Sequence, residues 1–152
     1  MADLSKALQV LRDVSTATVT TILLKKGLRN VWMRGPRPQR ANQARVAGRA
    51  FTLRFIPQRE DLATPAAWSS PRSTRAAVEA MTADSVVVVD AMGTTDAGIF
   101  GDILCARMAK RNVAGLVTDG VMRDMAGVLG TGLSVWCQGT AAPASVAGLT
   151  FV

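Results

Sequence analysis

Ser85-Val86-Val87-Val88-Val89-Asp90 is the stretch that decides the fold. A short run of β-branched residues closed by a polar residue is typical of a strand buried on both faces of a parallel sheet. Toward the C-terminus, the pattern predicts a helix over 101–111, a strand over 113–118, a short helix after Asp124 and a strand over 133–137. Strands that alternate with helices predict an α/β layer with parallel pairing.

The part that precedes this run predicts further elements. Leucines at helical spacing indicate an amphipathic helix over 2–12. Ser15 is expected to cap a second helix that ends at Gly27 in the left-handed conformation. We also expect a short strand over 31–33, a strand over 46–55, a polar loop over 57–70, a helix over 71–81 opened by Ser70-Pro71, and a final strand from 146. That final strand stops abruptly, so we expect a single domain, 1–152, that lacks a C-terminal part of its fold.

Composition limits the class of protein. A chain of 152 residues with 49% hydrophobic and 19% charged residues can bury a core as one domain. No apolar run approaches the ~20 residues of a membrane span, and no signal peptide is recognisable, so we expect a cytoplasmic protein without membrane association. The only cysteines, Cys105 and Cys137, suggest no disulfide framework.

The absence of histidine narrows the chemistry. Without histidine, the chain has no Ser-His-Asp or Cys-His catalytic unit and no His-ligated zinc. Any metal must then be bound through oxygen, which favours Mg²⁺ or Mn²⁺ as the cofactor.

Positive charge is concentrated in the first 60 residues. They hold twelve Lys/Arg and three acids, a balance of +9, while the remainder holds six Lys/Arg and eight acids, a balance of −2. The basic residues are spaced singly with few aromatic residues between them, unlike the stacked aromatic motifs of RNA-binding sheets. We therefore favour a solvated or subunit-facing basic surface over nucleic-acid binding.

Two short segments are candidates for the chemistry. Gly101-Asp102-Ile103-Leu104 opens a helix, whose backbone N–H groups can hold an anion. Arg123-Asp124 follows the next strand and offers a fixed cation beside a hard oxygen ligand. Together they predict a site for a small carboxylate and a divalent metal. Two structural alternatives stay open: Arg123 and Asp124 form a local ion pair, and Gly101-Asp102 is an ordinary helix start. For Asp90 and Asp119 we favour a role as turn residues at strand ends.

A family resemblance adds to this interpretation. Four segments, Thr16-Ala17-Thr18-Val19, Gly101-Asp102-Ile103-Leu104, Gly115-Leu116-Val117-Thr118-Asp119-Gly120 and Val121-Met122-Arg123-Asp124, resemble the RraA-like family of regulators of ribonuclease activity, which includes metal-dependent 4-hydroxy-4-methyl-2-oxoglutarate aldolases. The resemblance implies a three-layer β/β/α fold of the swivelling-domain type, in trimers or hexamers with active sites between subunits. Three tryptophans in an apolar-rich chain agree with an oligomer.

The resemblance also implies residue roles. Backbone amides of Gly101, Asp102, Ile103 and Leu104 would hold a pyruvate carboxylate. Arg123 would contact the substrate, and Asp124 would bind the metal. Asp102 would lie close to the metal's water shell, so Arg123 and Asp102 are the expected catalytic residues.

The expected function is therefore a divalent-metal-dependent lyase that cleaves a 2-oxo acid to pyruvate, or an oxaloacetate decarboxylase. The alternative is a non-catalytic regulator that binds a ribonuclease or helicase. Gly127 favours the alternative, because catalytic members of the family usually carry an acid there. The retained Arg123-Asp124 pair favours the enzyme.

Overall fold

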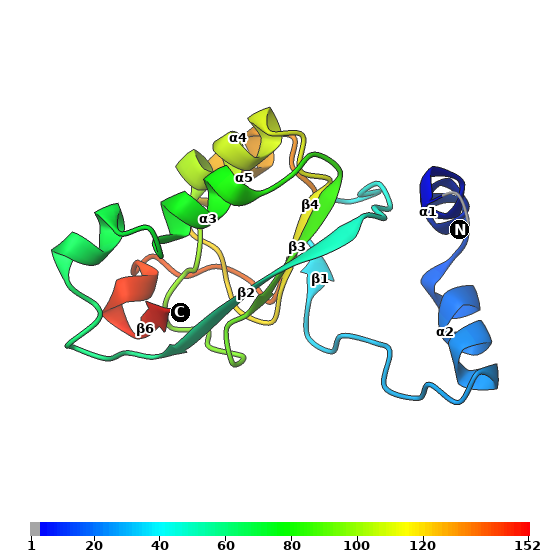
Figure 1. Cartoon of the computed structure of the whole chain (residues 1–152), viewed down its shortest axis with the longest axis horizontal. Coiled ribbons are helices and arrows are strands. Elements are labelled where there is room, and N and C mark those ends of the chain that lie inside the picture. Colours follow the sequence, from blue (N-terminus) through cyan, green and yellow to red (C-terminus); the bar gives the residue numbers. More distant parts are fainter. Residues whose placement is uncertain (1–3) are drawn as a thin grey trace.

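The computed structural model describes residues 4–152. The helices are α1 (Leu4–Asp13), α2 (Thr16–Lys25), α3 (Thr74–Ala80), α4 (Asp102–Lys110) and α5 (Met125–Gly130), with short 3₁₀ turns η1 (Pro65–Ser69) and η2 (Ser145–Ala147). The strands are β1 (Arg37–Pro38), β2 (Arg49–Pro57), β3 (Ser85–Asp90), β4 (Gly115–Thr118), β5 (Val135–Cys137) and β6 (Leu149–Phe151). They form a mixed α/β fold, as the sequence predicts (Figure 1).

The six strands form one sheet in the order β1-β5-β4-β3-β2-β6. The four inner strands are parallel, with Phe51 opposite Val87 and Val87 opposite Leu116. Strands β1 and β6 close the two edges in the antiparallel direction. The predicted strand at Ser85–Asp90 is confirmed as β3, next to the centre of the sheet.

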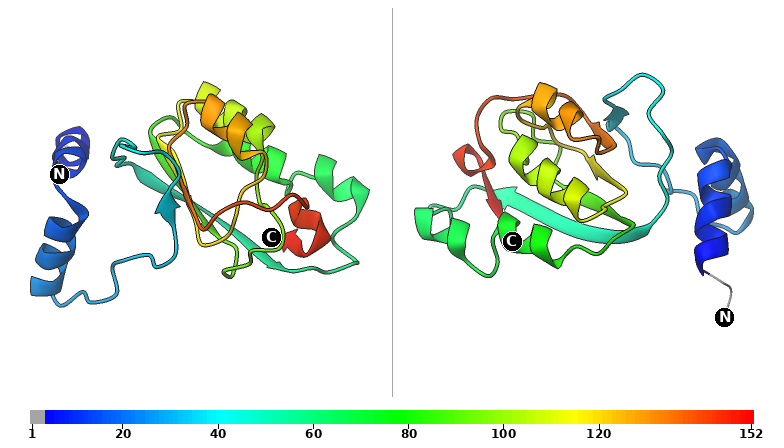
Figure 2. Two further views of the ribbon diagram at one scale, coloured as in Figure 1. Left: turned by 180° about the vertical axis from the view of Figure 1, so that it is seen from behind. Right: turned by 90° about the horizontal axis from the view of Figure 1, so that it is seen from above.

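Helices α3, α4 and α5 cover one face of the sheet (Figures 1 and 2). Each connects neighbouring parallel strands, and each successive strand is added on the same side, so right-handed crossovers place all three helices on one face. Val87 and Val89 point to this face and are buried with Met108 of α4. Val86 and Val88 point to the opposite face and are only half-buried. We call this opposite face the open face.

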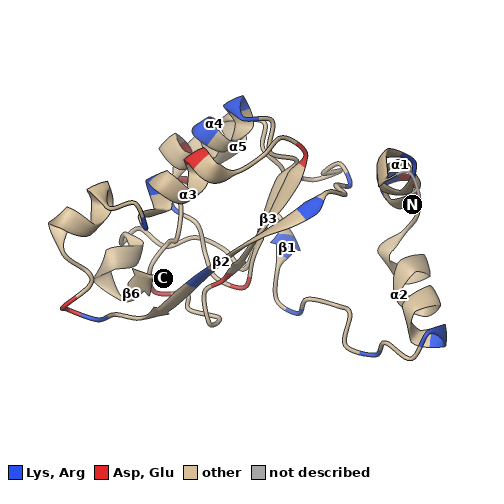
Figure 3. Cartoon of the chain, in the orientation of Figure 1, with Lys and Arg blue, Asp and Glu red and all other residues tan. Residues whose placement is uncertain are grey.

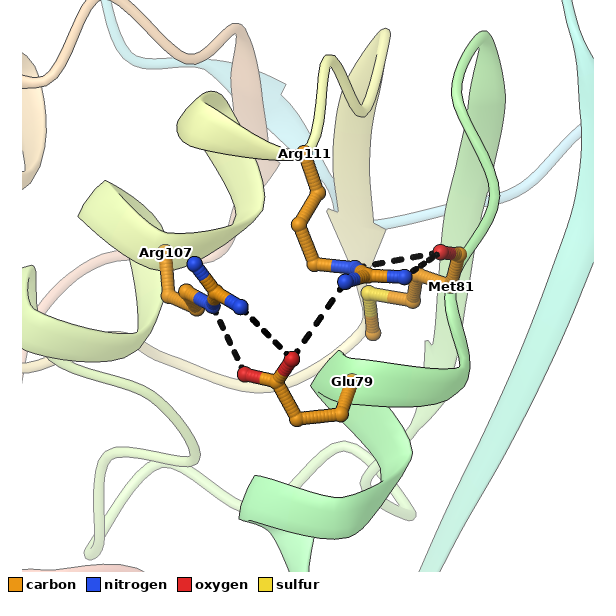
Figure 4. Close-up of polar contacts among 4 residues, drawn as sticks. All are labelled: Glu79, Met81, Arg107 and Arg111. Atoms are coloured by element: carbon orange, nitrogen blue, oxygen red, sulfur yellow. Dashed lines mark hydrogen bonds and ion pairs between the residues drawn. The ribbon is translucent and has the colours of Figure 1, made fainter.

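A charged cluster joins α3 to α4 on the outer surface of the helix layer (Figure 4). Glu79 accepts two hydrogen bonds of 2.7 Å from Arg107 and one of 3.3 Å from Arg111. Arg111 also donates to the backbone carbonyl of Met81 at 2.8 Å. The hydrogen bonds from Arg107 hold the pKa of the Glu79 carboxyl below its ordinary value.

Helices α1 and α2 lie outside the sheet body (Figures 1 and 2). The predicted cap is confirmed, since Ser15 accepts a hydrogen bond from Thr18 N–H at 3.1 Å, and Gly27 has φ +85°. Arg45 donates to the carbonyl of Asp13 at the end of α1, and Arg12 donates to the carbonyl of Ala47. These two arginines tether the helix pair to the start of β2.

Two predicted elements differ in the structure. Residues 31–33 form no strand, because they run alongside no other strand with which a ladder could form. The predicted helix at Ser70-Pro71 begins instead at Thr74, where Ser73 accepts a hydrogen bond from Ala76 N–H. Both Ser70 and Ser73 suit a cap, and the turn at 70–73 decides between them.

Candidate functional site

Two loops at the carboxyl ends of the strands run side by side and build the candidate site. Ile99 N–H donates to the carbonyl of Val121 at 3.0 Å, and Arg123 N–H donates to the carbonyl of Phe100 at 2.8 Å. Gly98 forms a parallel bridge with Val121. The segment that opens α4 is therefore fixed against the segment that carries Arg123 and Asp124. Ligand sites of parallel α/β sheets lie at this end of the strands.

The stem of Arg123 crosses directly over Gly98. A methyl group built on Gly98 would meet Cγ of Arg123 and would lie 2.8 Å from its backbone nitrogen. Nε of Arg123 is shielded from solvent and has no hydrogen-bond partner within residues 4–152. A guanidinium without a protein partner can bind an anionic ligand. The sequence pattern did not single out Gly98 as a site residue. The only feature that could have indicated it is its position three residues before Gly101.

Asp124 projects toward the start of α4. Its backbone is left-handed, at φ 49° and ψ 44°, and it forms the N-terminal boundary of α5 without capping it through its side chain. A methyl group on Gly101 would lie 2.9 Å from Oδ2 of Asp124, so the carboxylate reaches this position because Gly101 has no side chain. Left-handed backbone at a residue other than glycine is a strained state that concentrates at functional sites.

Arg123 and Asp124 do not neutralise each other. Across the described part of the chain, neither side chain takes part in an ion pair or a side-chain hydrogen bond. The alternative of a local structural ion pair is therefore wrong. Both charges stay available to a ligand.

Asp102 lies between α4 and α5. Its Oδ1 accepts a hydrogen bond from Ile103 N–H at 2.8 Å, so it occupies one of the four amides expected to hold a carboxylate. A methyl group on Gly127 would lie 2.7 Å from Cβ and 2.8 Å from Oδ2 of Asp102. The two helix starts approach this closely because Gly127 has no side chain. An acid at Gly127 would displace Asp102.

The remaining polar residues near the site hold loops in place. Asp119 accepts hydrogen bonds from Ala91 N–H at 2.6 Å and from Gly93 N–H at 2.8 Å. Asp90 pairs with Arg54 at 3.2 Å. Both aspartates therefore act as strand-end turn residues, in agreement with the favoured interpretation of the sequence. They fix the loop after β3.

Neither cysteine is a nucleophile at neutral pH. Burial and, to a smaller extent, the negative charge of Asp102 raise the pKa of the Cys105 thiol to about 12. Burial also raises the pKa of Cys137, whose thiol donates to the carbonyl of Gly139 at 3.3 Å. Both thiols are packing groups.

The site fits a hard divalent cation in part. In residues 4–152, no three Asp, Glu, Cys or His side chains gather closely enough to form a complete metal site. Magnesium commonly uses one or two protein carboxylates and keeps several waters. Asp124 supplies an exposed carboxylate that is neither hydrogen-bonded nor ion-paired to another described side chain. Asp102 lies on the neighbouring helix start. These oxygens suit Mg²⁺ or Mn²⁺ in type, and solvent, substrate or a second subunit would complete the shell.

Comparison with known proteins identifies the family. The family model described as RraA-like, Aldolase/RraA, matches residues 9–150. The chain therefore belongs to the RraA-like family, as the four sequence segments suggest. This family contains both aldolases and ribonuclease regulators.

Three relatives illustrate the range of the family. RraAS2 of Streptomyces coelicolor, described as an unusual member of the RNase ES inhibitor RraA protein family, has a TM-score of 0.85 and 33% identity over 97% of this chain and 69% of its own. An RNA-processing inhibitor RraA from Thermus has a TM-score of 0.60 and 24% identity, over 82% of this chain and 69% of its own. Protein DlpA of Legionella pneumophila is 27% identical over 95 residues, 62% of this chain, and the match spans only 14% of DlpA.

Among the described residues, none forms a helix of the length and apolar character needed to cross a bilayer.

Proposed function

We propose that this chain is a divalent-metal-dependent lyase that releases pyruvate from a 2-oxo acid, of the 4-hydroxy-4-methyl-2-oxoglutarate aldolase or oxaloacetate decarboxylase type. One observation carries the proposal. An unpaired arginine, an unpaired exposed aspartate and the start of α4 converge, because Gly98 and Gly101 lack side chains. If Arg123 and Asp124 served only to stabilise the fold, we would expect them to form an ion pair with each other.

The chain's own residues serve three tasks in this proposal. The amides at the start of α4 orient the carboxylate of the substrate. The Ile103 amide can bind the substrate once its hydrogen bond to the Asp102 side chain is broken. The Arg123 guanidinium faces the keto oxygen. When the C–C bond breaks, its electron pair moves into the substrate and negative charge grows on that oxygen, so Arg123 stabilises the transition state more than the ground state.

A bound Mg²⁺ or Mn²⁺ would supply Lewis-acid polarisation of the same keto group. Asp124 would hold it, with Asp102 beside it on the neighbouring helix start. Asp102 would also accept or return the proton of the reaction, because the resulting pyruvate enolate must be protonated at carbon. The expected assembly is a homotrimer or hexamer, and the two buried thiols suit a reducing cytoplasm.

The test is pyruvate release from oxaloacetate and from 4-hydroxy-4-methyl-2-oxoglutarate, with and without Mg²⁺. We expect metal-stimulated release by the unaltered chain and none by Asp124→Asn. Asparagine tolerates the left-handed backbone, so this variant should keep its melting temperature. Asp96→Asn, in the exposed loop before the site, is the matched control and should keep full activity. Full metal-stimulated turnover by Asp124→Asn would show that Asp124 is not the metal ligand.

A second candidate function is a non-catalytic regulator of a ribonuclease. Two observations favour it. Gly127 stands where catalytic relatives usually have an acid. One similar structure is described as an unusual member of the RNase ES inhibitor RraA family, and another as an RNA-processing inhibitor. Inhibition of a purified RNase E-type enzyme by the unaltered chain, unchanged in Asp124→Asn and without any pyruvate release, would support this candidate over the lyase.

A further inference from the structure

Three segments continue β3, β4 and β5 beyond the sheet, and backbone hydrogen bonds join them to one another. The segments are 98–100, 121–123 and 139–144. Met122 N–H donates to the carbonyl of Gly139 at 3.0 Å, and Gly98 N–H donates to the carbonyl of Pro143 at 2.9 Å. Arg123 belongs to the second segment, so its position depends on how the three segments are held against the sheet.

The connections from the strands to these segments differ in length. The second segment follows β4 after Asp119 and Gly120, and the third follows β5 after Gln138 alone. The first segment follows β3 only after residues 91–97. A longer connection has more conformations to lose, so its two ends restrain it less than they restrain a short one. Gly98 lies at the end of this longest connection, and its placement therefore needs a further contact.

Asp119 makes that contact. Its Oδ1 accepts the hydrogen bond from Ala91 N–H at 2.6 Å, and its Oδ2 accepts the one from Gly93 N–H at 2.8 Å. The backbone carbonyl of Asp119 accepts a hydrogen bond from Nε2 of Gln138. A methyl group on Gly120 would lie 2.7 Å from Cβ of Ala91, so the long connection packs directly on the end of β4. All three connections therefore meet at Asp119.

The carboxylates at this end of the sheet bind the chain itself. Figure 3 shows acidic segments, in red, where the inner strands end. Both oxygens of Asp119 accept backbone N–H groups. Asp90 accepts a hydrogen bond from Met92 N–H at 2.9 Å, within its own loop, and pairs with Arg54. Asp119 is the one of these two that joins the loop after β3 to the segment after β4, and it acts through the backbone that it holds.

We propose that Asp119 is a positioning residue for the candidate site. Its carboxylate fixes the connection after β3 and thereby places Gly98 beneath the stem of Arg123. The start of α4 follows Gly98 directly, so the same contact sets the distance between the α4 amides and the guanidinium. A misplacement of about 1 Å can lower a reaction rate by about 10²-fold. The kinetic part of this inference rests on the proposed lyase function.

The first test is the variant Asp119→Asn in the full chain, with oxaloacetate and Mg²⁺. Asparagine keeps the size of the side chain, but its NH₂ group cannot accept one of the two backbone N–H groups. We expect kcat for pyruvate release to fall by about 10- to 10²-fold and KM to stay within about threefold. Inhibition by oxalate, which resembles the enolate of pyruvate, should weaken at least about tenfold. A partly unfolded enzyme would instead lose kcat with an unchanged inhibition constant.

Asp90→Asn is the matched control. It alters a carboxylate on the same loop, but Asp90 makes no described contact with the segment that carries Arg123. Its kcat and its inhibition by oxalate should stay within about twofold of the unaltered chain. Gln138→Met provides a second variant at an exposed residue and removes only the donor to the Asp119 carbonyl. It should weaken inhibition by oxalate about threefold.

Hydrogen exchange tests the positioning without turnover. The amides of Ile99 and Arg123 donate the hydrogen bonds that join the first two segments. In Asp119→Asn they should exchange at least about tenfold faster than in the unaltered chain, because the contact that closes this region is weakened. In Asp90→Asn their exchange should not change.

Two results would overturn the proposal. One is unchanged exchange of Ile99 and Arg123 in Asp119→Asn, whatever the activity of the chain. The other is an equal loss of oxalate inhibition in Asp119→Asn and Asp90→Asn. Faster exchange in a chain that releases no pyruvate would support the positioning role and refute only the proposed lyase.

Discussion

At the scale of single residues, the site depends on three glycines whose missing side chains admit charged neighbours. Gly98 admits the stem of Arg123, Gly101 admits the Asp124 carboxylate, and Gly127 admits Asp102. The charged residues alone would be an unremarkable set of surface groups. Their approach to one another converts them into a candidate site.

Arg123 should govern turnover more than folding. Arg123→Lys keeps the charge but loses the planar fork that can bind a carboxylate and a keto oxygen together. We expect kcat/KM for pyruvate release to fall by a factor on the order of 10²–10³, equivalent to about 3–4 kcal/mol of transition-state stabilisation. The melting temperature should hardly change, because the arginine has no structural ion pair. Arg75→Lys is the control, and unchanged kinetics in Arg123→Lys would refute the role.

At the scale of elements, the contact between the starts of α4 and α5 can be tested by two glycines of one helix. Alanine in place of glycine normally stabilises a helix by about 0.5–1 kcal/mol. We expect Gly130→Ala to stabilise the chain, because a methyl group there meets nothing within 4 Å. Gly127→Ala should destabilise it, because the methyl group would lie 2.7 Å from Cβ of Asp102. Urea unfolding of both variants gives the comparison, and equal effects would contradict the close packing.

The α3–α4 cluster should make stability depend on pH. The pKa of Glu79 is lowered in the folded chain by the hydrogen bonds from Arg107, so its stabilising contribution is present above the ordinary carboxyl pKa and is lost as pH falls. Glu79→Gln should therefore lower the melting temperature at pH 7, and the difference should close below about pH 4. Glu60→Gln, at an exposed residue with no ion pair among those described, is the control. A difference that persists at low pH would show that the cluster acts through packing.

At the scale of the whole molecule, the candidate site lies beside an exposed apolar residue that could contact a second subunit. Ile103, beside Asp102 at the start of α4, is 80% exposed. An apolar side chain at the mouth of a charged site suits a subunit contact. We expect light scattering to show a trimer or a hexamer, and Ile103→Asp to shift it toward monomer with loss of pyruvate release. Ile22→Asp, on α2, should leave the assembly intact. A monomer over the micromolar range would count strongly against the proposed active site.

Sequence patterns determined the elements whose signals are local. The valine run of β3 reads as a buried strand because consecutive β-branched side chains must be covered on both faces. Ser15 and Gly27 bound α2 through a side-chain cap and a left-handed turn, each of which needs only neighbouring residues. The order of strands and helices likewise follows from alternation along the chain.

Only the tertiary structure decided contacts between distant segments. No local sequence feature shows that Ser73, and not Ser70, caps α3. Nor does any local feature show that residues 31–33 have no neighbouring strand with which to pair. The left-handed Asp124, its approach to Gly101 and the fit of Gly127 against Asp102 arise because two loops are held together by hydrogen bonds across more than twenty residues of chain. The groove beside Trp32 has the same origin, since residues from 31–36 and from the open face of the sheet line it together.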